Sequence, residues 1–156
     1  MTAVAAPDFA VYSADRQLQL VVEVKSTPKT DLAWAMKMRR NLLQHQVLPT
    51  APYFLLALPD HLYLWASGGE DVARQPDFQA DTRDVLQRYM PPGAGAAQET
   101  LSGPALEWLI GSWLNDLTQG VPDPSDALHP ETDWLRASGL PERVRTGVVH
   151  AETSAS

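Results

Sequence analysis

The segment from Tyr53 to Leu58 is an unbroken run of six apolar residues, and it leaves few choices for the fold. A strand without polar alternation is buried on both faces, as are the parallel strands inside α/β sheets. Such a strand needs other elements packed on each side. We therefore expect the α/β fold class, with one sheet and at least one helix packed on it.

The neighbouring segments predict the rest of this sheet. Phe9–Ser13 and Gln17–Lys25 predict two strands of an antiparallel hairpin, because Ala14-Asp15-Arg16 between them supplies turn residues. A helix over 31–46 leads to the apolar run, which we expect to pair in parallel with the second strand through a right-handed crossover. A final turn leads into a strand over 61–66. The expected order is β–β–α–β–β.

Periodicity within these elements predicts which side chains face the core. In the second strand, alternation gives one face to Leu18, Leu20, Val22 and Val24 and the other to Gln19, Val21, Glu23 and Lys25. In the helix, we expect Thr30 as the N-cap and Asp31 in the first turn. The apolar stripe of this helix comprises Leu32, Met36, Leu43 and Val47, and its polar side comprises Lys37, Arg40, Asn41 and Gln44.

The second half of the chain predicts fewer elements. We expect a short helix over Thr82–Met90 and a longer one over Pro104–Thr118 that closes over one face of the sheet. The apolar residues of the longer helix follow a helical stripe, namely Leu106, Leu109, Ile110, Trp113, Leu114 and Leu117. From Val121 onward the composition becomes polar and acidic. We therefore expect one domain over residues 1–120 and an acidic, partly ordered tail over 121–156, with a short helix around Trp134.

Composition narrows the function classes. The net charge is −7, but residues 1–66 hold six basic and five acidic side chains, whereas residues 67–156 hold six and fourteen. The acidity therefore belongs to the second half, and the first half still offers a locally neutral or basic surface to a polyanion. The absence of cysteine excludes disulfides, thiolate nucleophiles and Cys-ligated metals. No apolar run approaches the ~18 residues that span a bilayer, so we expect no membrane partner and a cytoplasmic location.

Three residues of the predicted hairpin carry candidate chemistry. Glu23 and Lys25 are two apart on one strand, so both point to the same face, with side-chain origins roughly 6–7 Å apart. A turn centred between residues 15 and 16 pairs position 8 with about position 23, which brings Asp8 beside Glu23. Two converging carboxylates form a hard oxygen site suited to Mg²⁺ or Mn²⁺. A divalent ion beside a lysine favours phosphodiester hydrolysis.

These residues also resemble a known motif. Pro7-Asp8, fourteen intervening residues and Glu23-Val24-Lys25 look like the motif of the PD-(D/E)xK nuclease superfamily, which has the restriction-endonuclease-like fold. The order of elements over residues 7–66 is similar too, and the chain resembles small bacterial members of uncharacterised role. The resemblance implies a mixed four-stranded sheet (β-β-α-β-β) with flanking helices, and frequent homodimers.

The resemblance further implies a role for each motif residue. Asp8, Glu23 and the backbone carbonyl of Val24 would be ligands of Mg²⁺ or Mn²⁺, and Lys25 would be the catalytic lysine. The implied reaction is the hydrolysis of DNA by metal-activated water, which leaves 5′-phosphate and 3′-hydroxyl ends.

This chain departs from the family pattern in two features. Family members usually begin with a helix before the first motif, whereas six residues precede Pro7. We expect either a truncated start or another helix, such as 104–118, in that place. One subgroup has a Gln followed four residues later by Tyr, whereas here Gln44 is followed by Leu48. Gln44 remains a candidate neighbour of the site.

Each interpretation has an alternative. Lys37, Arg40 and Gln44 are candidate substrate contacts, but a solvated helix face also explains Lys37 and Arg40. The Glu23–Lys25 pair is alternatively a surface salt bridge worth ~0–1 kcal/mol. For the whole chain, the alternative to a nuclease is a catalytically inactive nuclease-fold scaffold, which binds a protein partner or forms a homodimer through the Trp-bearing helix 104–118.

Overall fold

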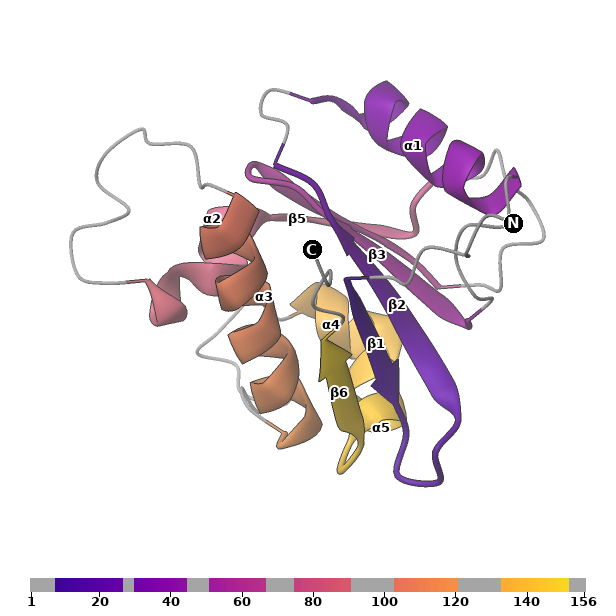
Figure 1. The fold of residues 1–156 in the computed structure, drawn as a ribbon, viewed down its shortest axis with the longest axis vertical. Helices are drawn as coiled ribbons and strands as arrows, with labels where there is room; N and C mark the ends of the chain where they lie inside the picture. The colour runs from indigo at the N-terminus through magenta and orange to yellow at the C-terminus, as the bar shows by residue number, and fades with distance from the viewer. Residues whose placement is uncertain are drawn as a thin grey trace, which may run out of the picture.

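The computed structural model describes residues 8–26, 30–44, 51–66, 75–90, 103–120 and 133–151. Within them, a six-stranded mixed sheet carries helices on both faces (Figure 1). The strands are β1 (Phe9–Tyr12), β2 (Leu18–Val24), β3 (Tyr53–Ala57), β4 (His61–Trp65), β5 (Phe78–Asp81) and β6 (Val148–Ala151), in the spatial order β5-β4-β3-β2-β1-β6. The helices are α1 (Leu32–Gln44), α2 (Thr82–Leu86), the 3₁₀ helix η1 (Gln87–Tyr89), α3 (Gly103–Thr118), α4 (Asp133–Ser138) and α5 (Leu140–Val144).

The apolar run forms the centre of the sheet, as predicted. β3 is buried along its whole length and pairs in parallel with β2, with Leu20 opposite Tyr53 and Val24 opposite Ala57. β1 and β2 form the predicted antiparallel hairpin, and β4 pairs antiparallel with β3. The α/β fold class is therefore confirmed, in the form of an open mixed sheet.

The two faces of the sheet are covered by different helices (Figure 1). On one face, which we call the α3 face, all six predicted stripe residues of α3 are buried against β1–β4 side chains that include Phe9, Val11 and Leu55. On the other, the α1 face, a smaller cluster comprises Val21, Ala35, Phe54, Leu56, Leu58, Tyr63 and Trp65. The core thus lies mainly between α3 and the sheet.

The sheet has two more strands than the four expected. β5 extends it antiparallel from β4, and β6 pairs antiparallel with β1, with Phe9 opposite Ala151 and Tyr12 opposite Val148. Each is a four-residue edge strand whose side chains are half-buried or exposed. Short edge strands need no apolar alternation, so their sequences carry no clear strand signal.

Residues 133–151 belong to the sheet and its core, which corrects the expectation of a partly ordered tail. α4 contains the short helix predicted around Trp134. Leu135, Leu140 and Val144 are buried in the same cluster as the α3 stripe, so the expected boundary at residue 120 divides one hydrophobic core. These few apolar residues stand in a mainly polar stretch of sequence, so their pattern did not predict that they join the core. Residues 121–132 and 152–156 lie outside the described residues.

Two local expectations also need correction. Val11 pairs with Leu20 but Tyr12 pairs with Leu18, so Gln19 is an extra residue in β2. This bulge moves Leu18 to the α1 face, where it packs against the smaller cluster, whereas unbroken alternation places it with Leu20.

The cap of α1 is Asp31 rather than Thr30. The Trp34 N–H donates to Asp31 Oδ1 at 2.9 Å, which satisfies one of the unpaired amides at the helix start. The apolar stripe of α1 is shallower than expected, because Leu32, Met36 and Leu43 are half-buried. The predicted end of this helix at residue 46, and Val47, lie outside the described residues.

Two tryptophans of α3 offer a matched test of this packing. Trp113 is 1% exposed and Trp108 is 65% exposed. Trp113→Ala removes a large side chain from the core, so we expect a loss of about 3–5 kcal/mol in the free energy of unfolding. Trp108→Ala should cost less than about 1 kcal/mol. Urea denaturation followed by circular dichroism measures both, and equal losses would contradict the assigned orientation of α3.

Candidate metal centre

The hairpin brings Asp8 to Glu23, as its turn predicts. Phe9 lies opposite Val22, and each further pair up to the bulge keeps the same register, so the next position places residue 8 opposite residue 23. Asp8 Oδ2 accepts a hydrogen bond of 2.7 Å from the backbone N–H of Val24. The side chains of two residues fifteen positions apart in the sequence therefore meet at one end of the hairpin.

Glu23 is buried beside one negative group, Asp8, and one positive group, Lys25. It is 6% exposed, and its Oε2 lies 3.5 Å from Lys25 Nζ. Burial raises the pKa of Glu23 to about 7; the negative charge of Asp8 and a hydrogen bond with Asp8 also raise this pKa, while Lys25 lowers it. The two carboxyl groups thus share a site in which a bound cation would favour the ionisation of both.

The backbone at Val24 is oriented toward the same point. In an extended strand, the N–H and C=O of one residue point to the same side. Because the Val24 N–H points to Asp8, the Val24 carbonyl faces that side of β2 as well. The predicted ligand set of two carboxylates and one carbonyl therefore lies on one side of the strand end.

This donor set fits one kind of ion better than others. No group of three or more His, Asp or Glu side chains converges anywhere in the described ranges. Zinc sites usually take three or four nitrogen or sulfur ligands, whereas Mg²⁺ accepts one or two carboxylates and completes its shell with water or phosphate oxygens. The residues present therefore fit Mg²⁺ or Mn²⁺, with coordination positions left for a substrate.

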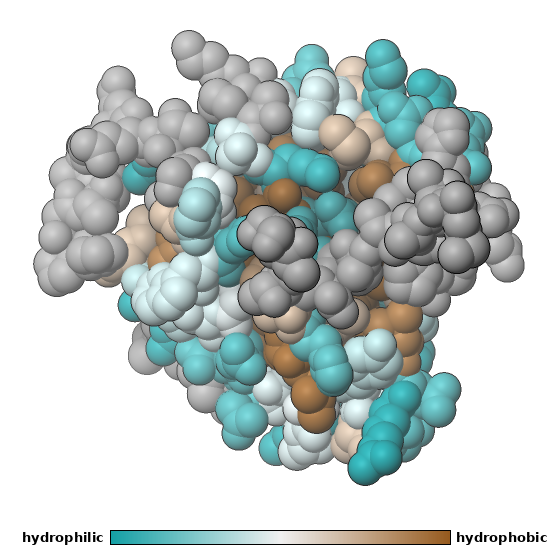
Figure 2. Space-filling view, viewed as in Figure 1, coloured by the Kyte–Doolittle hydropathy of each residue, from teal (hydrophilic) through white to brown (hydrophobic). Residues whose placement is uncertain are grey.

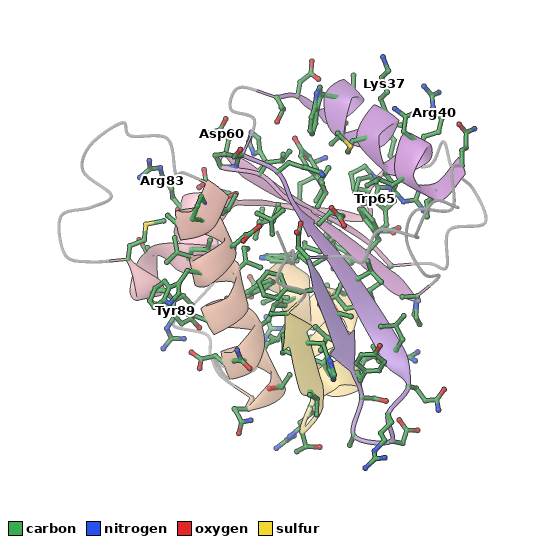
Figure 3. The ribbon with its side chains drawn as sticks, viewed as in Figure 1. Lys37, Arg40, Asp60, Trp65, Arg83 and Tyr89 are labelled. Atoms are coloured by element: carbon green, nitrogen blue, oxygen red, sulfur yellow. The ribbon has the colours of Figure 1, made fainter. Side chains whose placement is uncertain are left out.

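The other predicted contacts lie elsewhere. Lys37, Arg40 and Gln44 are exposed, and Lys37 and Arg40 project from α1 away from the sheet (Figure 3). The structure does not bring them to the carboxylate pair, because α1 packs on the sheet through the opposite side, with Ala35 buried. Arg39 also points inward, 1% exposed, with its guanidinium 5.0 Å from the centre of the Trp65 ring.

Sequence patterns missed one neighbour of the site. The start of α3 lies beside Ser26, the residue after Lys25: a Cβ built on Gly103 would be 3.5 Å from the Ser26 Cβ. No sequence signal links residues 26 and 103, since only the packing of α3 on the sheet joins them.

Comparison of the chain with protein-family models, with curated proteins and with solved structures finds no match. None of the helices in the described ranges combines the length and apolar character of a membrane span.

The raised pKa of Glu23 predicts a pH dependence of stability. The folded state holds this proton up to a pKa of about 7, whereas the unfolded state releases it near 4.5. Between these values the folded state binds more protons, so the free energy of unfolding should fall as pH rises from 4.5 to 7 and then level off. The contribution of this group is on the order of 3 kcal/mol.

Chemical denaturation in EDTA at pH 5, 6, 7 and 8 measures this trend. Glu23→Gln keeps the shape of the side chain without its charge, so it should flatten the decline. An unchanged slope in this variant would show that Glu23 does not carry the pH dependence.

Proposed function

We propose that this protein is a Mg²⁺- or Mn²⁺-dependent nuclease that hydrolyses phosphodiester bonds of DNA. The observation that carries the proposal is the convergence of Asp8, Glu23 and Lys25 at one end of the hairpin, with Lys25 Nζ 3.5 Å from Glu23 Oε2. Asp8 and Glu23 would hold the ion together with the Val24 carbonyl. When bound, such an ion acidifies water and offsets the charge that develops on a phosphate.

The position of Lys25 supports a role as the catalytic lysine. Its side chain is 36% exposed, while that of Glu23 is 8% exposed, so the ammonium lies between the buried carboxylate and solvent. From there it can hold the nucleophile or stabilise the negative charge of the phosphoryl group during in-line attack opposite the 3′ oxygen. The second carboxylate, that of Asp8, is held in place by the backbone N–H of Val24.

The arrangement of helices supports the resemblance to the PD-(D/E)xK superfamily. α3 covers the sheet face opposite α1 and packs against β2 and β6. It therefore occupies a flanking position of the kind that the family's leading helix supplies. β6 extends the sheet beyond β1, so the strand that directly follows Asp8 has neighbours on both sides.

A scaffold function is the second candidate, and one observation favours it. Trp108 is 65% exposed on α3, on a helix whose opposite side is fully buried. Exposed tryptophan is typical of protein–protein contacts. In that case the nuclease fold would serve a partner or a homodimer, and the carboxylate pair would bind no divalent ion.

Metal titration separates the two candidates. We expect saturable Mn²⁺ binding, measured from the loss of the free-ion EPR signal, and its loss in Asp8→Asn and Glu23→Gln. Because the ion must displace the proton of Glu23, whose pKa is about 7, the affinity should rise from pH 6 to pH 8 and change little above pH 8. Binding that persists in both variants would assign the ion to another site.

Cleavage tests the catalytic roles. With plasmid and single-stranded DNA in Mg²⁺, we expect Asp8→Ala and Glu23→Ala to abolish metal-dependent cleavage, with the fold intact by circular dichroism. Lys25→Ala should lower the cleavage rate by about 10²–10³-fold, the usual effect of removing one charge-stabilising donor. Lys37→Ala is the matched control, because Lys37 is an exposed lysine on the outer side of α1. Wild-type activity in Lys25→Ala would refute the assigned role.

A further inference from the structure

A second concave site lies at the opposite end of β1 from Asp8. This pocket, which we call the hairpin pocket, has a volume of about 470 Å³. Its walls come from the β1–β2 turn, from β6 and from the loop before β6, and they include Tyr12, Ser13, Arg16, Thr146, Val148 and His150. None of these residues belongs to the candidate metal centre.

The hairpin pocket and the metal centre lie on the same face of the sheet. Val11 and Val149 pack into the α3 face, so their neighbours Tyr12, Val148 and His150 point to the other face. Asp8 directly precedes β1, and Glu23 lies between Val22 and Val24 of the α3-face cluster, so the Glu23 side chain points to the other face as well. The separation along the strand is about 13 Å, so a single strand a few nucleotides long can reach both sites.

The chemistry of the pocket combines a ring platform with a cation. The rings of Tyr12 and His150 meet edge to face, with centroids 5.2 Å apart and planes at 67°. Arg16 forms no ion pair with any residue of the described segments. Val148 is 55% exposed, and Figure 2 shows apolar surface over β6 bordered by hydrophilic residues at the hairpin tip. A planar base and a phosphate together match this lining.

Two residues that line the pocket have a left-handed backbone conformation, which L side chains rarely adopt. Arg16 has φ +66° and Thr146 has φ +57°, and no other non-glycine residue in the described ranges has positive φ. Arg16 ends a three-residue turn closed by Ser13 N–H to the Gln17 carbonyl at 2.8 Å, a position that favours glycine. Strain of this kind gathers at functional sites.

The loop before β6, which forms the opposite wall of the pocket, is also fixed by backbone contacts. The Thr146 N–H donates to the Thr118 carbonyl at 2.8 Å, which ties the loop before β6 to the end of α3. Gly147 lies so close to β1 that a Cβ there would be 1.9 Å from the Tyr12 carbonyl oxygen. The backbone of both walls is therefore fixed before a ligand binds, so binding loses little free energy to ordering the backbone.

We propose that the hairpin pocket binds one nucleotide of the substrate strand, with its base against Tyr12 and His150 and a phosphate at Arg16. The inference rests on the proposed nuclease function and adds a substrate class to it. Because a base stacked inside a duplex cannot enter such a pocket, the substrate is a single strand or an unpaired strand end. The scissile phosphate of that strand would lie at Asp8 and Glu23.

Binding without cleavage tests the pocket directly. We would measure fluorescence anisotropy of a labelled single-stranded DNA of about twelve nucleotides in EDTA, and of the matching duplex. Arg16→Gly should weaken single-strand binding about tenfold and reduce the dependence of affinity on salt by about one phosphate contact. Since glycine relieves the positive φ, the melting temperature should stay equal or rise. A merely structural role for Arg16 predicts no such combination.

Further variants separate the ring from the cation. Tyr12→Leu should weaken binding about tenfold and Tyr12→Phe should preserve it, because only the ring is required for stacking. Arg136→Ala removes an exposed arginine of α4, paired with Asp133 at 2.7 Å, and should leave the affinity unchanged.

The outcomes distinguish the pocket from the nuclease activity. If the wild type cleaves DNA and Arg16→Gly binds the single strand as the wild type does, the pocket proposal is wrong and the nuclease stands. If binding depends on Arg16 and Tyr12 but nothing is cleaved, the pocket stands and the nuclease proposal fails. A mononucleotide or inorganic phosphate that competes as strongly as the oligonucleotide would overturn the assignment to a strand.

Discussion

The hydrogen bond from the Val24 N–H to Asp8 Oδ2 holds the candidate site together. It places one carboxylate next to Glu23, which is buried and has a raised pKa. Two adjacent carboxyl groups in a poorly solvated site destabilise the charged state unless a cation is present, and Lys25 offsets only part of that cost. The hydrophobic contacts of the sheet must supply the remainder. A locally unfavourable charge arrangement on a well-packed sheet is typical of functional sites.

The two faces of the sheet contribute differently to this arrangement. The α3 face carries most of the core, with α3, α4 and α5 packed on it. On the other face, α1 packs over side chains of β2, β3 and β4, whereas Val148 and His150 on β6 stay exposed. None of the described helices packs over β1 and β6 on this face, and β1 runs from the metal centre to the hairpin pocket. A stable face supports the fold, and a partly open face leaves room for a ligand.

Elements set by local contacts were predictable from the sequence, whereas those set by distant contacts were not. The hairpin register was predictable because a short turn sets the pairing of its strands, and α3 was predictable because its stripe is strictly periodic. Gln19 broke the alternation in β2, since a bulge depends on how the partner strand sits. β6 was missed because four edge residues gain their stability from β1 rather than from their own pattern.

The amino-acid sequence by itself determined the α/β class, the hairpin and the meeting of Asp8 with Glu23, because these follow from periodicity and a three-residue turn. Only the tertiary structure decided that α1 does not bring Lys37 and Arg40 to the carboxylate pair, that α3 begins beside Ser26, and that β6 completes a pocket. The physical reason is that the packing of whole elements sets the rotation of a helix on a sheet and the partner of an edge strand, and neither is encoded in a local pattern.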